Sequence, residues 1–361
     1  MCAAATGNRV RDVIGDMSDA EAARFFDEEV SNACEARGVA SSELGRFDEF
    51  CASIRALGDT PPWRPIVNTG QIVLANKYFP RLVALPAWDR VCEDEEDLLF
   101  PWLRALEEKA PIIAAELRSV CDADLRAGYC LGEANRATMA GTPGLTDTER
   151  SIYVPGFDDR PSNGYCHAVL IANEEPQKIS ELFPQTMAAL DECGVRAGVR
   201  LVAFGKQLPH TALHWHSDGR NFMLTAHLPL AAPRERSGER APPFGPPAPR
   251  MPNVALRDGA AGMVLAPLLT PHALAAGDSI DDLAVSRSWQ PTPPGGAARG
   301  VVFDTSFMHS AYNDGDEPAD ILFIDFFHPE LSVAEVEALK GFQQLLREKG
   351  EAVKFADDRK D

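Results

Sequence analysis

The spacing of apolar residues divides the chain into a helical beginning, a β-rich second half and a helical end. Over 19–37 and again over 42–57, apolar residues recur every three or four positions, which is the period of an amphipathic helix. Gly38 and Gly58 stand where these two helices are expected to end. We therefore expect residues 1–74 to form a helical N-terminal extension.

Three further helices are expected, over about 94–121, 176–192 and 333–349. Pro101 offers an alternative start for the first of them, and Pro184 interrupts the second. Ser332 and Glu335 have the spacing of a capping box, which places the start of the last helix directly after Ser332.

From about residue 197 the period changes to that of strands, which are expected over 199–204, 222–230, 300–303 and 320–327. Short strands separated by Pro and Gly turns favour a double-sheet jelly roll. The expected protein is mainly β with flanking helices (α+β). Its core is a double-stranded β-helix of the cupin type over 75–350, and 351–361 form a loose, charged tail.

Two long segments show neither the helix period nor the strand period. Residues 141–165 have the composition of a loop. Residues 231–258 are rich in Pro and Arg and cannot form a core strand. They form an insertion, which is either disordered or a mobile lid over the barrel mouth.

Composition narrows the possible partners. The chain has 361 residues with 35 basic and 54 acidic side chains, a net charge of −19, which argues against nucleic acid or an anionic membrane surface as partner. It has no apolar run long enough for a transmembrane helix, and its start is too polar for a signal peptide, so we expect a cytoplasmic protein. Eight scattered cysteines without a C-x-x-C pair indicate reduced thiols. A small-molecule substrate is the expected partner, and the oligomeric state stays open.

The candidate chemistry is concentrated in 209–230, which holds four of the eight histidines. His216 and Asp218 are two positions apart, so in an extended strand their side chains point to the same side. With a second histidine from elsewhere they would form the 2-His-1-carboxylate triad of non-haem Fe(II) oxygenases. Alone, H-x-D is a weak motif that surface and core histidines also produce.

A second stretch makes the pattern specific. Residues 303–307 read FDTSF and are followed by His309 and Asn313, and an apolar strand then ends in DFFHPEL at 325–331. This phrase resembles the C-terminal signature of the aspartyl/asparaginyl β-hydroxylases, which are Fe(II)/2-oxoglutarate oxygenases on a double-stranded β-helix.

The central stretch resembles the same family. His216, Asn221 and HLPL at 227–230 reproduce the family's spacing of a metal histidine, an Asn five residues on and H-L-x-L eleven residues on. YFPRL at 78–82 with Trp88 is similar to an upstream family segment. The resemblance extends over about 75–348 and excludes the insertion.

Fe(II), 2-oxoglutarate and O2 are therefore the implied metal, cosubstrate and oxidant. The resemblance implies His216 and His309 as metal ligands and His227 as a neighbour of the cosubstrate carboxylate. Asp218 completes a triad that many bacterial relatives have and that the animal endoplasmic-reticulum members lack.

Two positions depart from the family. Its cosubstrate-binding arginines, ten residues after the second metal histidine and nine after the first, correspond to Ala319 and Thr225. A carboxylate is best bound by a bidentate cation. Cosubstrate contacts are thus expected from Thr225 at the family position and from the cations Arg220, Lys206, Arg287 and Arg200.

The expected enzyme is an Fe(II)/2-oxoglutarate-dependent dioxygenase that oxidises an unactivated C–H bond by hydroxylation or oxidative cyclisation. Its substrate is expected to be a free amino acid or a carboxylate metabolite. Two alternatives stay open. In one, an Fe(II) oxidase acts on a chelating substrate without 2-oxoglutarate, as the missing arginines suggest. In the other, the chain is a cupin-type metal-binding protein without redox chemistry.

Overall fold

The computed structural model of the protein describes residues 23–55, 63–65, 71–74, 77–88, 99–122, 145, 147–155, 164–195, 198–213, 215–233, 259–266, 285–289 and 299–348. The expected tail, 351–361, lies outside these residues. So does the expected insertion, 231–258, apart from its first three residues.

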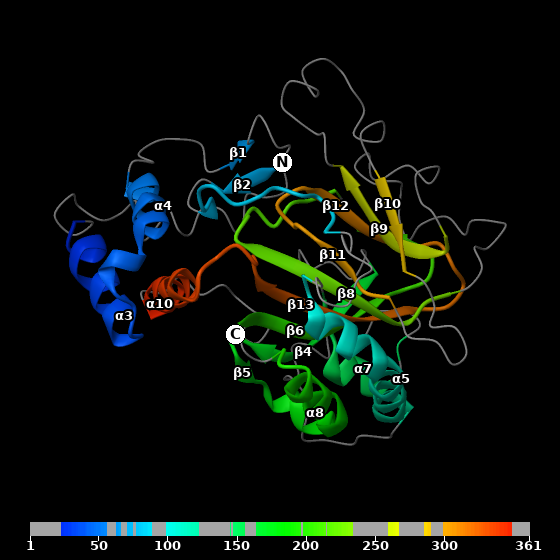
Figure 1. The fold of residues 1–361 in the computed structure, drawn as a ribbon. Coiled ribbons are helices and arrows are strands. Elements are labelled where there is room, and N and C mark those ends of the chain that lie inside the picture. Colours follow the sequence, from blue (N-terminus) through cyan, green and yellow to red (C-terminus); the bar gives the residue numbers. More distant parts are fainter. Residues whose placement is uncertain are drawn as a thin grey trace, which may run out of the picture.

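Two antiparallel sheets form the core (Figure 1). The larger sheet has the order β11-β8-β13-β6-β4-β3, with β5 paired to β4. Its strands are β3 (Val154–Pro155), β4 (Tyr165–Ala172), β5 (Glu175–Pro176), β6 (Val199–Gln207), β8 (Met223–Ala231), β11 (Val301–Phe303) and β13 (Ala319–Phe327). The smaller sheet has the order β10-β9-β12-β7, formed by β7 (Thr211–Ala212), β9 (Ala261–Ala266), β10 (Val285–Ser288) and β12 (Met308–Asn313). This pair of sheets is the expected double-stranded β-helix.

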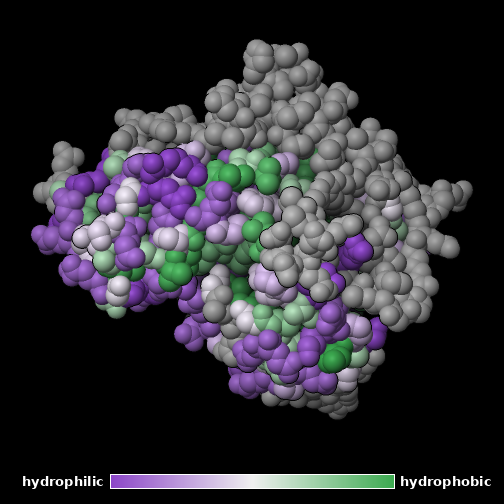
Figure 2. Space-filling model, in the orientation of Figure 1, coloured by the Kyte–Doolittle hydropathy of each residue, from purple (hydrophilic) through white to green (hydrophobic). Residues whose placement is uncertain are grey.

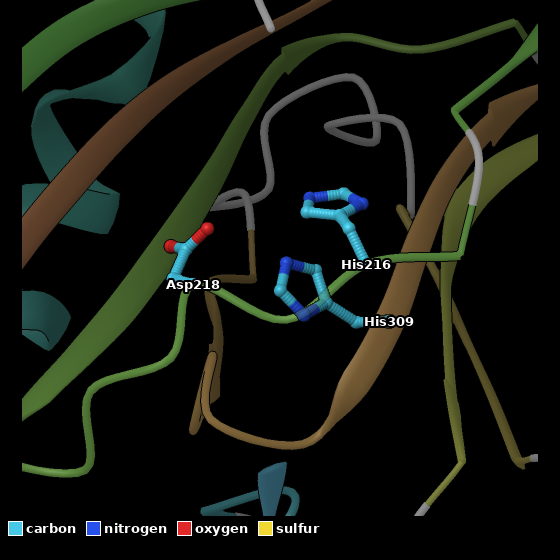
Figure 3. Close-up of side chains that lie close together, drawn as sticks. All are labelled: His216, Asp218 and His309. Carbon is cyan, nitrogen blue, oxygen red and sulfur yellow. The ribbon is translucent and has the colours of Figure 1, made fainter. Parts of the chain in front are cut away.

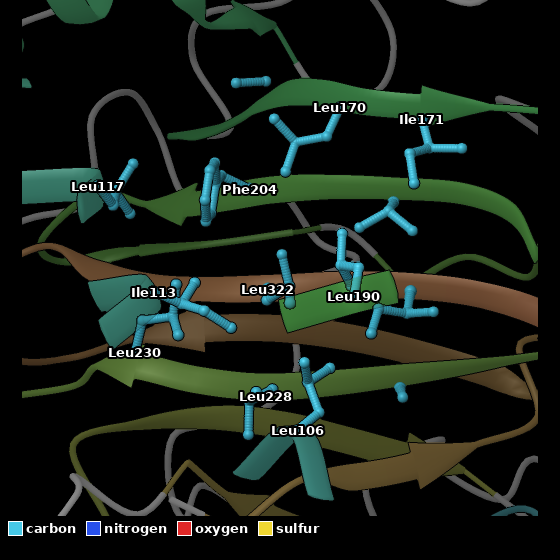
Figure 4. Packing of buried hydrophobic residues seen from close by; sticks show 14 of the residues in the cluster. Leu106, Ile113, Leu117, Leu170, Ile171, Leu190, Phe204, Leu228, Leu230 and Leu322 are labelled. Carbon is cyan, nitrogen blue, oxygen red and sulfur yellow. The ribbon is translucent and has the colours of Figure 1, made fainter. Parts of the chain in front are cut away.

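Side chains alternate in direction along each strand, so one face of the larger sheet packs against helices and the other faces the smaller sheet. On β8, Leu224, Ala226 and Leu228 belong to the apolar cluster beneath helix α5 (Pro101–Asp122) and helix α8 (Pro184–Glu192). Figure 4 shows this layer, with α5 side chains packed over the strands. The other face looks toward the smaller sheet. A second cluster there joins β13 residues to Met263 and Leu265 of β9.

A separate group of helices is formed by the two ends of the described chain. The π-helical turn η1 (Phe25–Glu29) leads into α3 (Val30–Ala36), a 3-10 turn η2 (Ser41–Glu43) precedes α4 (Gly45–Arg55), and these pack with α10 (Val333–Glu348). The ring of Phe342 on α10 contacts phenylalanines of η1 and α4. The capping box at the start of α10 is confirmed, since Ser332 N donates to Glu335 Oε2 at 2.8 Å and Glu335 N to Ser332 Oγ at 3.2 Å.

Most expected elements are confirmed, and the differences have local causes. Helix α5 begins at Pro101, and Pro184 begins α8 after a 3-10 turn η6 (Lys178–Leu182), because proline fits the first turn of a helix. The expectation of a loop over 141–165 was wrong. Helix α7 (Asp147–Ile152) and strand β3 lie within that range, and β4 starts at its end.

The face in Figure 2 carries hydrophilic residues over the helices, with hydrophobic residues in the band between the helical groups. Among the helices of the described residues, none combines the length and the apolar character needed to cross a membrane.

Candidate metal centre

Two histidines and an aspartate from distant parts of the sequence converge at one point (Figure 3). His216 and Asp218 follow β7, whereas His309 lies on β12. One nitrogen or oxygen atom of each side chain lies within 4.8 Å of the others. The structure thus brings together the three residues that the sequence selected as metal ligands.

The two histidines form a cross-strand pair. His216 N donates to His309 O at 3.0 Å and His309 N donates to His216 O at 2.8 Å, which is an isolated antiparallel bridge. Side chains directly opposite one another in an antiparallel pair point to the same face. The two ring centroids accordingly lie 4.2 Å apart.

A turn brings Asp218 to the same point. The backbone N–H of Asp218 donates to Thr305 O at 2.9 Å, and Gly219 has a φ of 73°, which glycine adopts without strain. The Ser217 hydroxyl lies 2.6 Å from Ile72 O and accepts the N–H of Gly219 at 3.1 Å. Ser217 therefore fixes the short segment that joins two of the three candidate ligands.

Strand β2 (Ile72–Leu74), which pairs with β1 (Trp63–Pro65), ties the two ligand segments together. Ile72 N donates to Ser306 O at 2.7 Å, and the preceding Gln71 donates its side-chain amide to Asp304 Oδ2 at 2.8 Å. Burial raises the pKa of Asp304 to about 7, against the lowering effect of hydrogen bonds from Ser306 and Gln71. That residues before 75 support the site was not expected from any sequence pattern.

The hydrogen bond that the His309 ring makes leaves Nε2 as the nitrogen available to a metal. Its Nδ1 lies 2.9 Å from Phe307 O, and because a carbonyl oxygen only accepts, the proton of a neutral ring is assigned to Nδ1. Nε2 then keeps its lone pair. Burial, and next the charge of His216, lower the pKa of His309 to about 4, so the ring is in the neutral form that metals require.

Asp218 is ionised. Burial by itself would raise its pKa, but Arg220, His309 and His216 together lower it. Two imidazoles and one carboxylate are the donor set of mononuclear Fe(II) oxygenases, and three such ligands would leave coordination positions open on a bound ion. These residues therefore fit Fe(II) and leave positions for further ligands.

A buried charged cluster lies beside Asp218. Asp325 on β13 accepts hydrogen bonds from Arg200 through Nε at 3.1 Å and through Nη2, and from the Thr225 hydroxyl. Arg220 reaches it less closely, with Nη2 3.3 Å from Asp325 Oδ2 and 3.4 Å from Asp218 Oδ2. The Nε atom of Arg220 is buried and has no hydrogen-bond partner.

Neither family arginine position offers a free binding group. Ala319 is fully buried in the apolar cluster between the sheets, against residues such as Tyr165 and Ile321. Thr225 uses its hydroxyl on Asp325. At the two positions where the family has carboxylate-binding arginines, this chain therefore has a tightly packed alanine and a threonine whose hydroxyl is already hydrogen-bonded.

One of the candidate cations, Lys206, points away from the metal site, and the side chain of another is not described. Lys206 is on the helix-covered face of β6, where its Nζ lies 3.2 Å from Glu149 Oε1, pairs with Asp320 and stands over the ring of Tyr153. Arg287 lies on β10 with its backbone opposite Met263, and its side chain is outside the described part of the structure.

His227 lies on the inner face of β8. Its ring packs against Trp289 at 5.6 Å, Phe303 at 4.9 Å and Phe323 at 5.5 Å between centroids. Burial is the main cause that lowers the pKa of His227 to about 3, so the ring is neutral. Its Nδ1 has no hydrogen-bond partner.

The remaining histidines have ordinary roles where they are described. His328 Nε2 donates to Val83 O at 3.0 Å, its Nδ1 accepts the Glu330 N–H at 3.2 Å, and its ring packs on Trp88. His210 Nε2 lies 3.0 Å from Oδ1 of the exposed Asp316. His214 and His272 lie outside the described residues.

One known family matches a part of the chain. The model of the family described as aspartyl/asparaginyl beta-hydroxylase matches residues 158–241, less than a quarter of the 361 residues. The match contains His216, Asp218 and His227 and ends before His309. The resemblance to that family is confirmed. The predicted enzyme class, an Fe(II)- and 2-oxoglutarate-dependent dioxygenase using O2, agrees with this match.

No curated protein matches the chain. Similar solved structures include a prolyl hydroxylase in complex with a hypoxia inducible factor peptide fragment from Trichoplax adhaerens, at 12% identity and a TM-score of 0.31, covering 70% of this chain and 98% of that one. Another is an oxidoreductase of the 2OG-Fe(II) oxygenase family from Burkholderia pseudomallei, at 14% identity and a TM-score of 0.28, covering 61% of this chain and 90% of that one. Because these scores are low, the fold assignment rests on the strand order and register described above.

Proposed function

We propose that the protein is an Fe(II)- and 2-oxoglutarate-dependent oxygenase that oxidises a C–H bond of a small carboxylate-bearing substrate, such as a free amino acid. The observation that carries the proposal is the convergence of His216, Asp218 and His309 within 4.8 Å. The balanced reaction for hydroxylation is R–H + 2-oxoglutarate + O2 → R–OH + succinate + CO2.

The chain's own contribution is to hold and shield the metal. When bound, Fe(II) supplies the redox centre for the decarboxylation of 2-oxoglutarate and the activation of O2. His309 Nε2, His216 and the Asp218 carboxylate would hold it. The Phe307 carbonyl keeps the His309 ring in one orientation, and Phe303 at 5.6 Å from that ring covers it from water.

The charges near the site favour an anionic ligand. Arg200 and Arg220 face two carboxylates, those of Asp218 and Asp325. A metal bound by Asp218 takes up that carboxylate, and Asp325 already accepts two hydrogen bonds from Arg200. Arg220 is then left with a surplus positive charge and an unused Nε–H, which suit a carboxylate of the substrate or of 2-oxoglutarate.

Burial favours a small ligand. The side chain of Arg220 is 13% exposed and that of Asp325 is fully buried. A group on a large folded protein would not easily reach this depth, whereas a free amino acid can, and its carboxylate complements Arg220.

Succinate release provides the test. Purified protein loaded anaerobically with Fe(II) is given O2, 2-oxoglutarate and a panel of free amino acids and small carboxylic acids, each beside its methyl ester. We expect acids to stimulate succinate release and their esters to fail. Equal stimulation by ester and acid would overturn the substrate class. An Arg220→Met variant separates the two sources of carboxylate, because it raises KM for the ligand whose carboxylate Arg220 binds.

The same assay tests the alternatives. O2 uptake without succinate would favour an oxidase that acts on a chelating substrate, which the filled position at Ala319 makes a specific second candidate. Tight binding of Zn(II) with no O2 uptake under any condition would favour a metal-binding protein without redox chemistry.

A further inference from the structure

Two buried side chains without hydrogen-bond partners contact each other between the sheets, His227 from β8 of the larger sheet and Trp289 from the residue after β10 of the smaller sheet. His227 Nδ1 and Trp289 Nε1 are both buried and have no hydrogen-bond partner. Their residues are 4% and 2% exposed, and the rings meet edge to face at 5.6 Å between centroids. Buried polar groups are nearly always hydrogen-bonded, so two adjacent exceptions point to a ligand that the pair receives.

The pair lies next to the metal ligands. The ring of Phe303 contacts both His227, at 4.9 Å, and the metal ligand His309, at 5.6 Å. Trp289 is held in place by its backbone, since its N–H donates to Ala261 O on β9 at 2.8 Å. A ligand that extends from the metal past Phe303 therefore reaches His227, and Trp289 lies against His227 on the far side.

The pair has the chemistry of an anion-binding site that is built from uncharged hydrogen-bond donors. A neutral histidine protonated on Nδ1 and an indole each donate one hydrogen bond, and neither contributes charge. A carboxylate accepts both, while a nearby divalent ion balances its charge. The two positions at which the family places arginines are closed in this chain, because Ala319 is packed and the Thr225 hydroxyl donates to Asp325.

We propose that Trp289, together with His227, binds one carboxylate of 2-oxoglutarate through two neutral N–H donors, in place of the cations that Thr225 and Ala319 have replaced. This inference rests on the proposed function. It adds a residue, Trp289, that neither the family motifs nor the charge pattern of the sequence indicates.

Trp88 provides a matched control. Its Nε1 is likewise buried without a partner, but its indole packs against Phe100 and His328 on the helix side of the larger sheet, away from the metal ligands. A ligand that binds at the metal should leave Trp88 unaffected.

The test follows the indole N–H signals directly. Full-length protein labelled with ¹⁵N-tryptophan is loaded with redox-inert Zn(II) and titrated with 2-oxoglutarate, and Trp289→Phe and Trp88→Phe assign the signals. We expect the Trp289 indole proton to move downfield as its N–H meets a carboxylate, and the Trp88 signal to stay. By calorimetry, Trp289→Phe should weaken binding of 2-oxoglutarate about tenfold or more, the effect of one hydrogen bond to a charged group, and Trp88→Phe should not.

Each other outcome overturns the proposal. A Trp289 signal that stays fixed while 2-oxoglutarate binds means that the carboxylate lies elsewhere. A signal that moves only with an amino acid from the substrate panel assigns the pair to the substrate. Because Phe variants of the other four tryptophans also assign the Trp289 signal by elimination, the test stands even if Trp289→Phe is unstable. Succinate release with an unmoved Trp289 signal would refute this inference and leave the proposed function intact.

Discussion

Replacing Ser217 by alanine should weaken metal binding without removing a ligand. The hydroxyl lies 2.6 Å from Ile72 O and accepts the Gly219 N–H at 3.1 Å, so the variant loses two hydrogen bonds that fix the turn between His216 and Asp218. At about 1 kcal/mol each, the two bonds amount to about 2 kcal/mol. If the metal-bound form depends on them fully, the dissociation constant rises about 30-fold, within the range known for groups that orient metal ligands.

Calorimetric titration with Zn(II), and with Fe(II) under anaerobic conditions, measures this change. Ser53→Ala is the matched control, because the Ser53 hydroxyl donates to Phe50 O at 2.7 Å within α4, away from the metal ligands. Thermal unfolding of both variants separates a general loss of stability from a loss at the site. A metal affinity of Ser217→Ala equal to that of the wild type would show that the turn does not need the hydroxyl.

Three further outcomes are expected. Asp325→Ala should lower the free energy of unfolding by about 3–5 kcal/mol in chemical denaturation, because Arg200 loses the carboxylate that it contacts in the buried state. Asp27→Ala, which breaks an exposed pair, should cost less than about 1 kcal/mol, and equal losses would contradict the reasoning. Because burial raises the pKa of Asp304 to about 7, its neutral form is favoured in the folded state, and its contribution to stability should fall as pH rises toward and through that value. Asp304→Asn should therefore gain stability relative to the wild type as pH rises from 3.8, the ordinary pKa of the group, to about 7, with no further change above that, and a pH-independent difference in unfolding free energy would refute this. His216→Ala should abolish Fe(II) binding measured by calorimetry while the midpoint of unfolding without metal stays close to that of the wild type.

Local patterns were enough to select the three residues that the structure brings together at one point. His216 and Asp218 were selected by their types and spacing and His309 by the phrase around it, although a turn rather than the expected extended strand brings Asp218 to the site. The strands that bear these phrases, β8 and β13, were predicted because their apolar runs are uninterrupted.

Contacts between segments that are far apart in the sequence could not be predicted from the sequence alone. Trp289 meets His227 because β10 pairs with β9 and so comes to lie opposite β8, a relation that no local period encodes. Gln71 reaches Asp304 across 233 positions of sequence. Such pairs depend on the whole topology.

The alternation of apolar residues in the sequence was enough to predict which face of its strand Lys206 lies on, and our prediction did not use it. It shares its strand parity with Val202 and Phe204, which pack beneath the helices, so it had to point away from the inner face of β6. Charge alone made it a candidate, and the alternation along the strand places it with Glu149 and Asp320.

The most direct test of the central claim is the visible absorption of the anaerobic complex. A 2-oxo acid that chelates Fe(II) gives a charge-transfer band, which requires both the metal site and the cosubstrate. We predict that the wild type with one equivalent of Fe(II) and excess 2-oxoglutarate shows this band, and that His309→Ala does not. An equally strong band in His309→Ala, or none in a wild type that binds Fe(II) stoichiometrically, would contradict the account.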